Sequence, residues 1–269
     1  MSISAALPDV QSESSRPART EVVAGIDHVR ILLSLPSGER TVATLELVAR
    51  VPTGQRGVHM SRLYRTFAPD GRIELSDFED RIRATAATQD SVELIATLSW
   101  EQLVERAAPA TGSLGFHPIK LQLRAWWTPG DLVVATRLES AAMLACPCSK
   151  ALSEDLGFHN QRGILQAEVL GNQFHRTTDL LACLDDAASN RVHPVLRRED
   201  EKEVIDVLSR RNSFRFVEDA ASLMLEGLEA AGFGGISLHV RSMESIHAHD
   251  AVAWAGPRGQ EMSEGIRVG

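Results

Sequence analysis

The sequence predicts an α+β protein in which antiparallel strands are covered by helices on one face. Two observations support this fold class. Segments of alternating apolar and polar residues, rich in Val, Ile, Leu and Thr, occur in pairs joined by short turns. Segments with helical spacing of apolar residues separate these pairs, so that most neighbouring strands form hairpins and not βαβ units.

The N-terminal half begins with a predicted hairpin. Residues 29–35 and 41–51 are predicted strands, and residues 36–39 (Pro-Ser-Gly-Glu) supply the turn. Residues 75–88 have helical spacing, and Ser76 or Asp77 could cap that helix.

The remaining elements continue the same alternation. Further strands are predicted at residues 92–100, 117–127, 131–140, 164–170, 235–240 and 251–255. Helices are predicted at residues 177–188, 199–210 and 217–231, the last ended by Gly232.

Length and composition limit the classes of protein that fit. A chain of 269 residues forms one large domain or two modules of about 100–150 residues each. A net charge of −8 argues against nonspecific binding to nucleic acid or to an anionic membrane. No apolar run approaches the ~20 residues that span a bilayer, and three cysteines form no disulfide framework. With no hydrophobic signal core at its start, the chain is expected in the cytoplasm. Residues 1–24 and 257–269 have the composition of disordered arms.

The segment with the strongest chemical character is Cys-Pro-Cys at residues 146–148. Pro147 restricts the backbone on both sides, so the two thiols are held on a stiff segment. With His159 shortly after, they are too few for a closed four-ligand zinc site but enough for a catalytic metal site with an open position. The alternative is that these cysteines are small buried hydrophobes, as we expect for Cys183 in its leucine-rich helix.

Four other clusters combine imidazole, hydroxyl and charged groups. They are residues 57–62 (GVHMSR), 193–202 (HPVLRREDEK), 216–219 (FVED) and 243–250 (MESIHAHD). Each also has an ordinary interpretation: an exposed loop, a solvated helix start, a favourable first-turn acid, or chance. If a strand continues through the last cluster, His247 and His249 share one face of it.

Together these motifs resemble one family, the bacterial GTP cyclohydrolases of the IB type, which catalyse the first step of the folate pathway. GVHMSR, CPCSK (146–150), HNQR (159–162), REDEK (198–202), FVED and ESIHAH (244–249) occur in the family's order and approximate spacing. The resemblance covers about residues 25–256. Glu199 stands where the family has proline, which places a second acid beside Glu201.

The resemblance implies a tandem tunnelling fold (T-fold), with modules at residues 25–144 and 145–256. Each module is an antiparallel sheet with helices packed on one face. The family's subunits join their sheets into barrels, so the resemblance also implies a homotetramer with active sites at subunit interfaces.

The implied activity is that of a hydrolase that converts GTP to 7,8-dihydroneopterin triphosphate and formate. The resemblance assigns the metal to Cys146, His159 and Glu201, with zinc or manganese as the expected ion and iron possible. Whether Glu199 competes with Glu201, and what Cys148 does, stays open from the sequence.

The remaining site residues are also carried over by resemblance. Glu218 matches the acid that binds the guanine edge, and His247 matches the acid–base histidine, with Glu244 beside it to orient or tune it. The triphosphate is assigned first to His59, Ser61 and Arg62, with Arg162, Arg197 and Lys202 in reserve.

Three competing functions remain possible from the sequence. An archaeal-like cyclohydrolase would use iron and release a cyclic-phosphate dihydroneopterin. Another T-fold enzyme, such as a deazaguanine nitrile reductase, would need a nicotinamide cofactor, for which no motif is present. A non-catalytic, zinc-stabilised purine-binding protein would have a closed four-ligand site.

Overall fold

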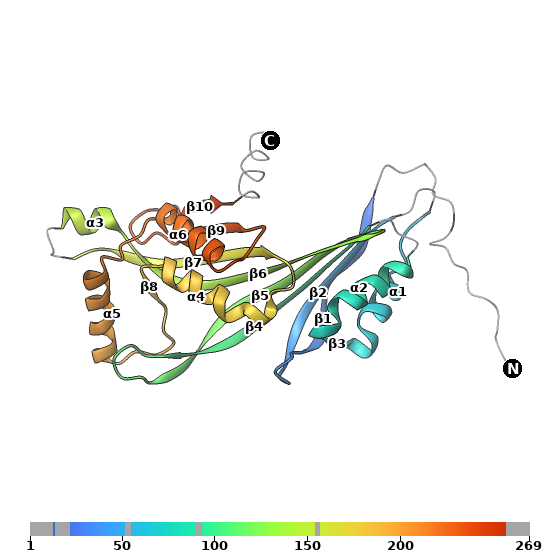
Figure 1. The fold of residues 1–269 in the computed structure, drawn as a ribbon, viewed down its shortest axis with the longest axis horizontal. Helices are drawn as coiled ribbons and strands as arrows, with labels where there is room; N and C mark the ends of the chain where they lie inside the picture. The colour runs from blue at the N-terminus through green and yellow to red at the C-terminus, as the bar shows by residue number, and fades with distance from the viewer. Residues whose placement is uncertain (1–12, 14–21, 52–54, 90–92, 154–156, 257–269) are drawn as a thin grey trace. The chain divides into compact units, whose positions relative to one another are not determined.

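The computed structural model describes residues 13, 22–51, 55–89, 93–153 and 157–256, and the predicted arms at 1–24 and 257–269 lie mostly outside these ranges. The described chain divides into two compact units (Figure 1). Unit 1 comprises Met1–Trp100 and Leu123–Val134, and unit 2 comprises Glu101–Gln122 and Ala135–Gly269. The boundary expected at residues 144/145 stays a prediction, since strands β4, β5 and β6 contribute residues to both units.

Unit 1 is a mostly antiparallel sheet with two helices on one face (Figure 1). Its elements are β1 (Val23–Ser34), β2 (Arg40–Arg50), α1 (Met60–Phe67), η2 (Pro69–Gly71), β3 (Arg72–Glu74), η3 (Leu75–Asp77), α2 (Phe78–Ala87) and the start of β4 (Leu94–Ala107). Strand β2 pairs antiparallel with β1 and β4, whereas the short β3 runs parallel to β1. Alternate β2 side chains are fully buried, and Phe67 meets Phe78 edge to face beneath them at 6.0 Å between ring centroids.

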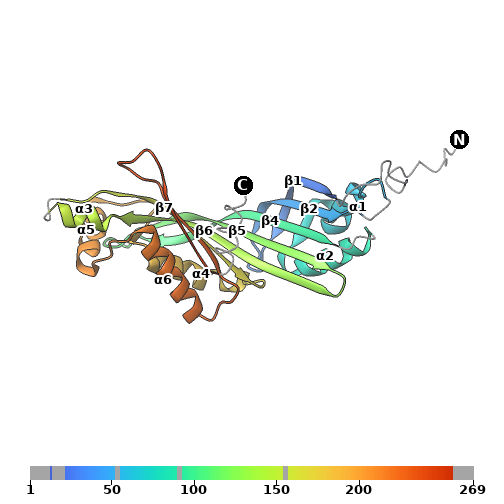
Figure 2. The ribbon, with the colours of Figure 1, turned by 90° about the horizontal axis from the view of Figure 1, so that it is seen from above.

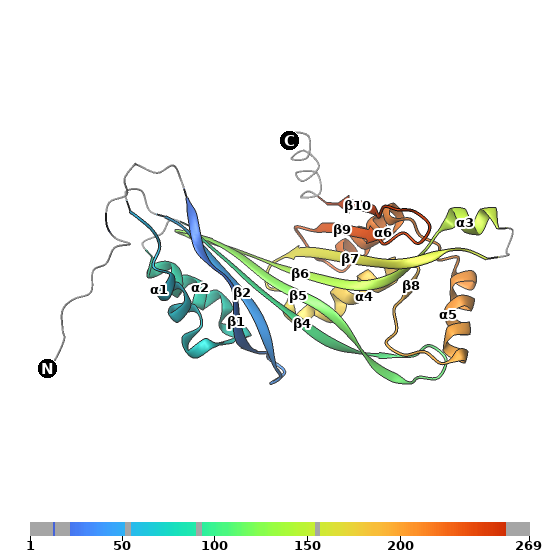
Figure 3. The same cartoon turned by 180° about the vertical axis from the view of Figure 1, so that it is seen from behind.

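Unit 2 carries an antiparallel sheet in the order β6-β7-β9-β10. Its elements are the end of β4, the start of β5 (Leu114–Thr128), the later part of β6 (Asp131–Ala145), α3 (Pro147–Leu152), β7 (Asn160–Leu170), η4 (Phe174–Arg176), α4 (Thr177–Ala187), β8 (Asn190–Arg191), α5 (Arg198–Arg211), α6 (Val217–Ala230), β9 (Ser237–Ser242) and β10 (Ala251–Ala255). Helices α4 and α6 pack against each other and against this sheet. Seen from behind, β6 leads into α3 at the same end of the unit as α5 (Figure 3).

The predicted α+β class, with antiparallel strands and helices on one face, is confirmed. Every predicted strand and helix is present, although β4, β5 and β6 run further than their sequence patterns indicated. Two short helices, α1 and α3, were missed: the segment at 57–62 is not a plain loop, because Met60 begins α1. Asp77 occupies the N-cap of α2 as one of the predicted caps, but its side chain accepts no capping hydrogen bond.

None of the helices in the described part of the chain is long and apolar enough to cross a membrane.

The interior of unit 2 contains a buried polar pair on adjacent strands. His117 of β5 is 4% exposed, and its Nε2 lies 3.0 Å from the Ser140 hydroxyl of β6. Burial lowers the pKa of His117 to about 4, and the nearby cationic groups of Arg106, Arg162 and His193 act in the same direction. His117 is therefore neutral in the folded protein at physiological pH.

This pKa predicts acid sensitivity between pH 6.5 and about 4. In that window the unfolded chain binds a proton at residue 117 that the folded chain does not, so the free energy of unfolding falls as the pH is lowered. The loss of stability across this window is roughly 3 kcal/mol. His117→Gln should flatten this part of the pH profile in urea unfolding experiments, whereas the exposed His175→Gln should not. Parallel profiles for wild type and His117→Gln would contradict the assignment.

Candidate active site

A cavity of about 330 Å³ in unit 2 gathers most of the sequence-predicted chemistry. Its wall is formed by the start of α3, the start of β7, the start of α6 and the connection between β9 and β10. It is lined by Cys146, Cys148, His159, Gln161, Arg215, Phe216, Val217, Glu218, Ser242, Glu244, His247, His249 and Ala251. The structure thus brings together the predicted Cys146, His159, Glu218, Glu244 and His247.

Cys146 and His159 are neighbours through their backbones. The Cys146 N–H donates to the His159 carbonyl at 3.2 Å. Ser149 joins the two a second time, because its hydroxyl donates to the Cys146 carbonyl (3.1 Å) and accepts from the His159 N–H (3.1 Å). Cys146 is also the N-cap of α3, and its Sγ accepts from the Ser149 N–H at 3.5 Å. The thiol and the imidazole are therefore held on one wall by a single local network.

A chain of side chains leads from His159 to Glu244. His159 Nδ1 lies 3.0 Å from Gln161 Oε1, and Gln161 Nε2 donates to Glu244 Oε1 at 3.1 Å. Glu244 was predicted to orient His247, but its hydrogen bond reaches Gln161 instead. Sequence reasoning missed Gln161, although its place in the HNQR motif beside His159 was a usable signal.

Glu218 lies in the first turn of α6 with its side chain exposed at the cavity. The neighbouring Asp219 closes the helix start, since its carboxylate accepts the Phe216 N–H at 2.9 Å. Among the described residues Glu218 has no hydrogen-bond partner of its own. It is free to bind a ligand near the positive end of the helix dipole.

His247 and His249 lie in the connection between β9 and β10. No strand continues through this cluster: β9 ends at Ser242 and pairing with β10 starts at the Ser242–Ala251 pair, which leaves residues 243–250 as a loop. In Figure 2 this dark red loop points away from α4 and α6. The two imidazoles still share one side, because their rings stack at 5.2 Å between centroids with an interplanar angle of 20°.

Glu201 is not part of the cavity wall. It lies in the first turn of α5, and its N–H donates to the Arg197 carbonyl at 2.9 Å. Glu199 shares that turn and does not line the cavity either. Within the described ranges, no group of three His, Cys, Asp or Glu side chains is placed to hold a metal ion.

The acid between these two glutamates has a structural task that the sequence did not reveal. Asp200 is fully buried and accepts hydrogen bonds from the N–H groups of Ala110 (3.0 Å), Thr111 (2.8 Å) and Arg197 (3.0 Å). Burial would raise the pKa of Asp200, but these bonds and the Thr111 hydroxyl outweigh it and hold the pKa at about 2. The carboxylate thus ties the start of α5 to the turn between β4 and β5.

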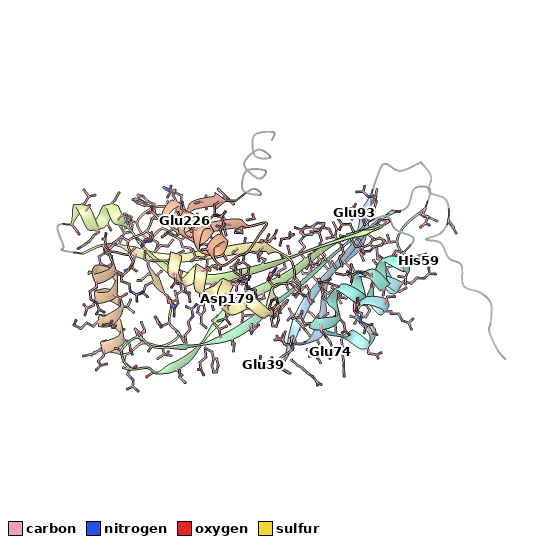
Figure 4. The ribbon with its side chains drawn as sticks, viewed as in Figure 1. Glu39, His59, Glu74, Glu93, Asp179 and Glu226 are labelled. Carbon is pink, nitrogen blue, oxygen red and sulfur yellow. The ribbon has the colours of Figure 1, made fainter. Side chains whose placement is uncertain are left out.

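The predicted phosphate-binding residues are spread over several places. His59 and Ser61 line a separate hollow of about 440 Å³ in unit 1, at the start of α1, where Arg62 follows (His59 is labelled in Figure 4). Arg162 lines another cavity of unit 2, of about 400 Å³. Lys202 pairs with Asp206 on α5, and Arg197 is the N-cap of that helix.

Arg215 is the cation that sequence reasoning missed. Among the described residues that line the active-site cavity, it is the only arginine or lysine. Its Nη1 donates to the Asn212 and Phe214 carbonyls at 3.2 and 3.0 Å.

The three cysteines differ in their surroundings. Cys148 is exposed and lines the cavity with Cys146. Cys183 lies on α4, does not line the cavity, and has its thiol pKa raised by burial and by the nearby Asp186 and Asp179.

Comparisons with known proteins agree on one family. The family model for type I GTP cyclohydrolase FolE2 matches residues 7–253. A GTP cyclohydrolase FolE2 of Exiguobacterium sibiricum is 30% identical over 247 residues, covering 85% of this chain and 80% of the relative. Another, of Nitratidesulfovibrio vulgaris, is 28% identical over 257 residues, covering 92% and 96%.

Among solved structures, uricase from Arthrobacter globiformis superimposes with a TM-score of 0.53 over 90% of this chain and 94% of that one. At 9% sequence identity this similarity concerns the fold alone.

Proposed function

Because this chain belongs to the type I GTP cyclohydrolase FolE2 family, we propose that it hydrolyses GTP to 7,8-dihydroneopterin triphosphate and formate in folate biosynthesis. The active site is the cavity of unit 2. The observation that carries this proposal is the convergence there of a thiol, imidazoles and an unpaired helix-start carboxylate: Cys146, His159, His247 and Glu218.

The donor groups of the cavity suit a divalent metal ion. Cys146 and His159 offer sulfur and nitrogen ligands from adjacent backbone positions, a combination that zinc accepts and that manganese or iron can share. We assign Glu201, in the first turn of α5, as the third ligand. The bound ion would supply a water of lowered pKa for attack at C8 of guanine.

Glu218 fits the recognition of guanine. A carboxylate accepts two parallel hydrogen bonds, which matches the N1–H and N2–H₂ donors of the guanine edge. Adenine lacks this pair of donors. Because Asp219 already caps α6, binding the base costs the helix no hydrogen bond.

His247 is the proposed acid–base group. Ring opening, loss of formate and ring closure each move protons, and imidazole titrates near neutral pH. His247 lines the cavity on a loop, where a stacked His249 limits the positions of its ring. Glu244 acts on the other imidazole of the site, His159, through Gln161.

The negative charge of the triphosphate supports an active site that is shared between subunits. Arg215 is the one side chain on the described cavity wall that carries a permanent positive charge. A single positive charge is too little to balance the charge of a triphosphate. We propose that the chain forms a homotetramer and that another subunit supplies His59, Ser61 and Arg62 to this cavity. Arg162 and Lys202 are the alternative cations of unit 2.

The test is incubation of the purified protein with GTP and Mn²⁺ or Zn²⁺, following formate, pterin fluorescence and product mass. The proposal expects one formate per GTP and a triphosphate-bearing pterin. A cyclic-phosphate product would assign the chain to the archaeal type of reaction. GTP that survives with either metal would refute the activity.

Metal binding is predicted to depend on Cys146. Loss of a direct ligand in Cys146→Ala should weaken Zn²⁺ binding by more than about 100-fold, since even outer-shell partners account for about 10–100-fold. Cys183→Ala, on α4, should bind Zn²⁺ as wild type does. Equilibrium dialysis with metal analysis measures both, and full zinc content in Cys146→Ala would transfer the role to Cys148.

Base recognition is predicted to depend on Glu218. In Glu218→Gln an amide donor can face a guanine donor, so GTP binding should weaken at least about 10-fold. Glu226→Gln is the matched control, because Glu226 (labelled in Figure 4) lies on the same helix and does not line the cavity. Titration with GTP measures both, and unchanged affinity in Glu218→Gln would show that the base is held elsewhere.

Turnover is predicted to depend on His247 without a loss of metal. His247→Ala should keep its zinc and bind GTP while losing about 10²–10⁴-fold in turnover, the usual size of an acid–base contribution. His175→Ala, on η4 outside the cavity, is the control. Zinc loss in His247→Ala would make this residue a ligand, and near-normal turnover would remove it from the mechanism.

A further inference from the structure

We propose that Gln161 is a positioning residue that, held by Glu244, fixes His159 in the tautomer with its proton on Nδ1. The lone pair of Nε2 is then permanently available to the cavity. This inference rests on the proposed function only in its last step, where Nε2 serves as a metal ligand.

The geometry consists of two consecutive hydrogen bonds between half-buried side chains. Gln161 Oε1 lies 3.0 Å from His159 Nδ1, and Gln161 Nε2 lies 3.1 Å from Glu244 Oε1. Among the residues that the structure describes, His159 Nε2 has no hydrogen-bond partner. All three residues line the same cavity.

The donor and acceptor of each of these two hydrogen bonds follow from the chemistry of the three side chains. A carboxylate accepts hydrogen bonds and donates none, so Gln161 must turn its NH₂ group toward Glu244. Its carbonyl oxygen then faces His159 and can only accept. His159 must therefore donate from Nδ1, which leaves Nε2 unprotonated in the neutral ring.

The backbone makes this arrangement rigid. Gln161 is the second residue of β7 and pairs with Leu144 of β6, while the His159 N–H is held by the Ser149 hydroxyl at 3.1 Å. Glu244 follows Met243, whose N–H donates to the Arg162 carbonyl at 2.9 Å and so extends the β7–β9 pairing. All three members are thus anchored to the same strand, β7.

One other group is near the same nitrogen. The Ser245 hydroxyl lies 3.5 Å from His159 Nδ1, at the limit of a hydrogen bond. A hydroxyl can both donate and accept, so Ser245 does not select a tautomer. Only the chain from Glu244 through Gln161 has a fixed direction.

The direct test reads the tautomer of His159 in the metal-free, full-length protein. Long-range ¹H–¹⁵N correlations of ¹⁵N-histidine-labelled protein distinguish a protonated from an unprotonated ring nitrogen, and His159→Gln identifies the signal among the nine histidines. We expect a protonated Nδ1 and an unprotonated Nε2 in the wild type. A protonated Nε2 in the neutral ring would overturn the proposal.

Two variants separate the links of the chain. Gln161→Met keeps the length of the side chain but removes both hydrogen bonds, so the Nε2–H tautomer should become populated. Glu244→Gln keeps shape and volume and removes only the directional constraint, because two amides can pair in either sense. It should give a mixture of tautomers, and it serves as the test if Gln161→Met does not fold. A wild-type tautomer in both variants would overturn the proposal.

The matched control lies on the same strand. Gln166 of β7 donates from Nε2 to Glu139 at 3.2 Å, and neither residue lines the cavity. Gln166→Met removes an equivalent amide–carboxylate bond and should leave the His159 signals unchanged. A changed His159 tautomer in this control would show that the loss of any such side-chain hydrogen bond from β7 has the same effect. That result would refute a specific role for Gln161.

The consequence for metal binding is measured with Zn²⁺ alone, without GTP. Gln161→Met should bind Zn²⁺ about 10–100-fold more weakly than wild type, as expected for the outer partner of a metal-ligating histidine, whereas Gln166→Met should not. If wild type has the expected tautomer but binds no Zn²⁺ and hydrolyses no GTP, the proposed function fails and the positioning of His159 stands. If Gln161→Met binds Zn²⁺ as tightly as wild type, Gln161 has no positioning role toward the metal. The proposed hydrolysis of GTP is not contradicted by that result.

Discussion

The antiparallel pairing of β6 with β7 is the constraint on which the candidate active site depends. The ladder ends with Ala145 opposite Asn160, and the next bond runs from the Cys146 N–H to the His159 carbonyl. This end of the ladder places the thiol and the imidazole side by side. The other edge of β7 pairs with β9, so the same strand also positions the loop that carries Glu244 and His247. One strand therefore positions both the Cys146–His159 wall and the loop of the cavity.

Helices α5 and α6 use their first-turn acids in the same way. In each helix the N3 aspartate, Asp200 or Asp219, accepts the N–H of the N-cap residue and so satisfies one donor at the helix start. The adjacent glutamate, Glu201 or Glu218, is left without a structural hydrogen bond from its side chain among the described residues. The helix start is thereby stabilised by one acid while its neighbour remains available for a ligand. Carboxylates placed there also benefit from the helix dipole.

Local sequence signals were enough for most of the fold. The hairpins of β1 with β2 and of β5 with β6 follow from alternating patterns on either side of turn residues, and α4, α5 and α6 follow from helical spacing. The same signals were too weak for α1 and α3. Helix α1 buries only Leu63 and Phe67, and α3 buries no residue at all. Neither helix therefore has enough apolar residues at helical spacing to be predicted from the sequence.

The sequence by itself determined the fold class, the order of the elements and the motifs that carry the chemistry, because these depend on residues close together in the chain. Only the tertiary structure decided which of those residues share a cavity. The bond from Gln161 to Glu244 joins side chains 83 residues apart, and its existence depends on the register of β7 with β9. Packing likewise decided that Asp200 hydrogen-bonds to the turn between β4 and β5. It also decided that Glu201 does not line the cavity. No local pattern encodes such contacts, since they form when distant strands and helices meet.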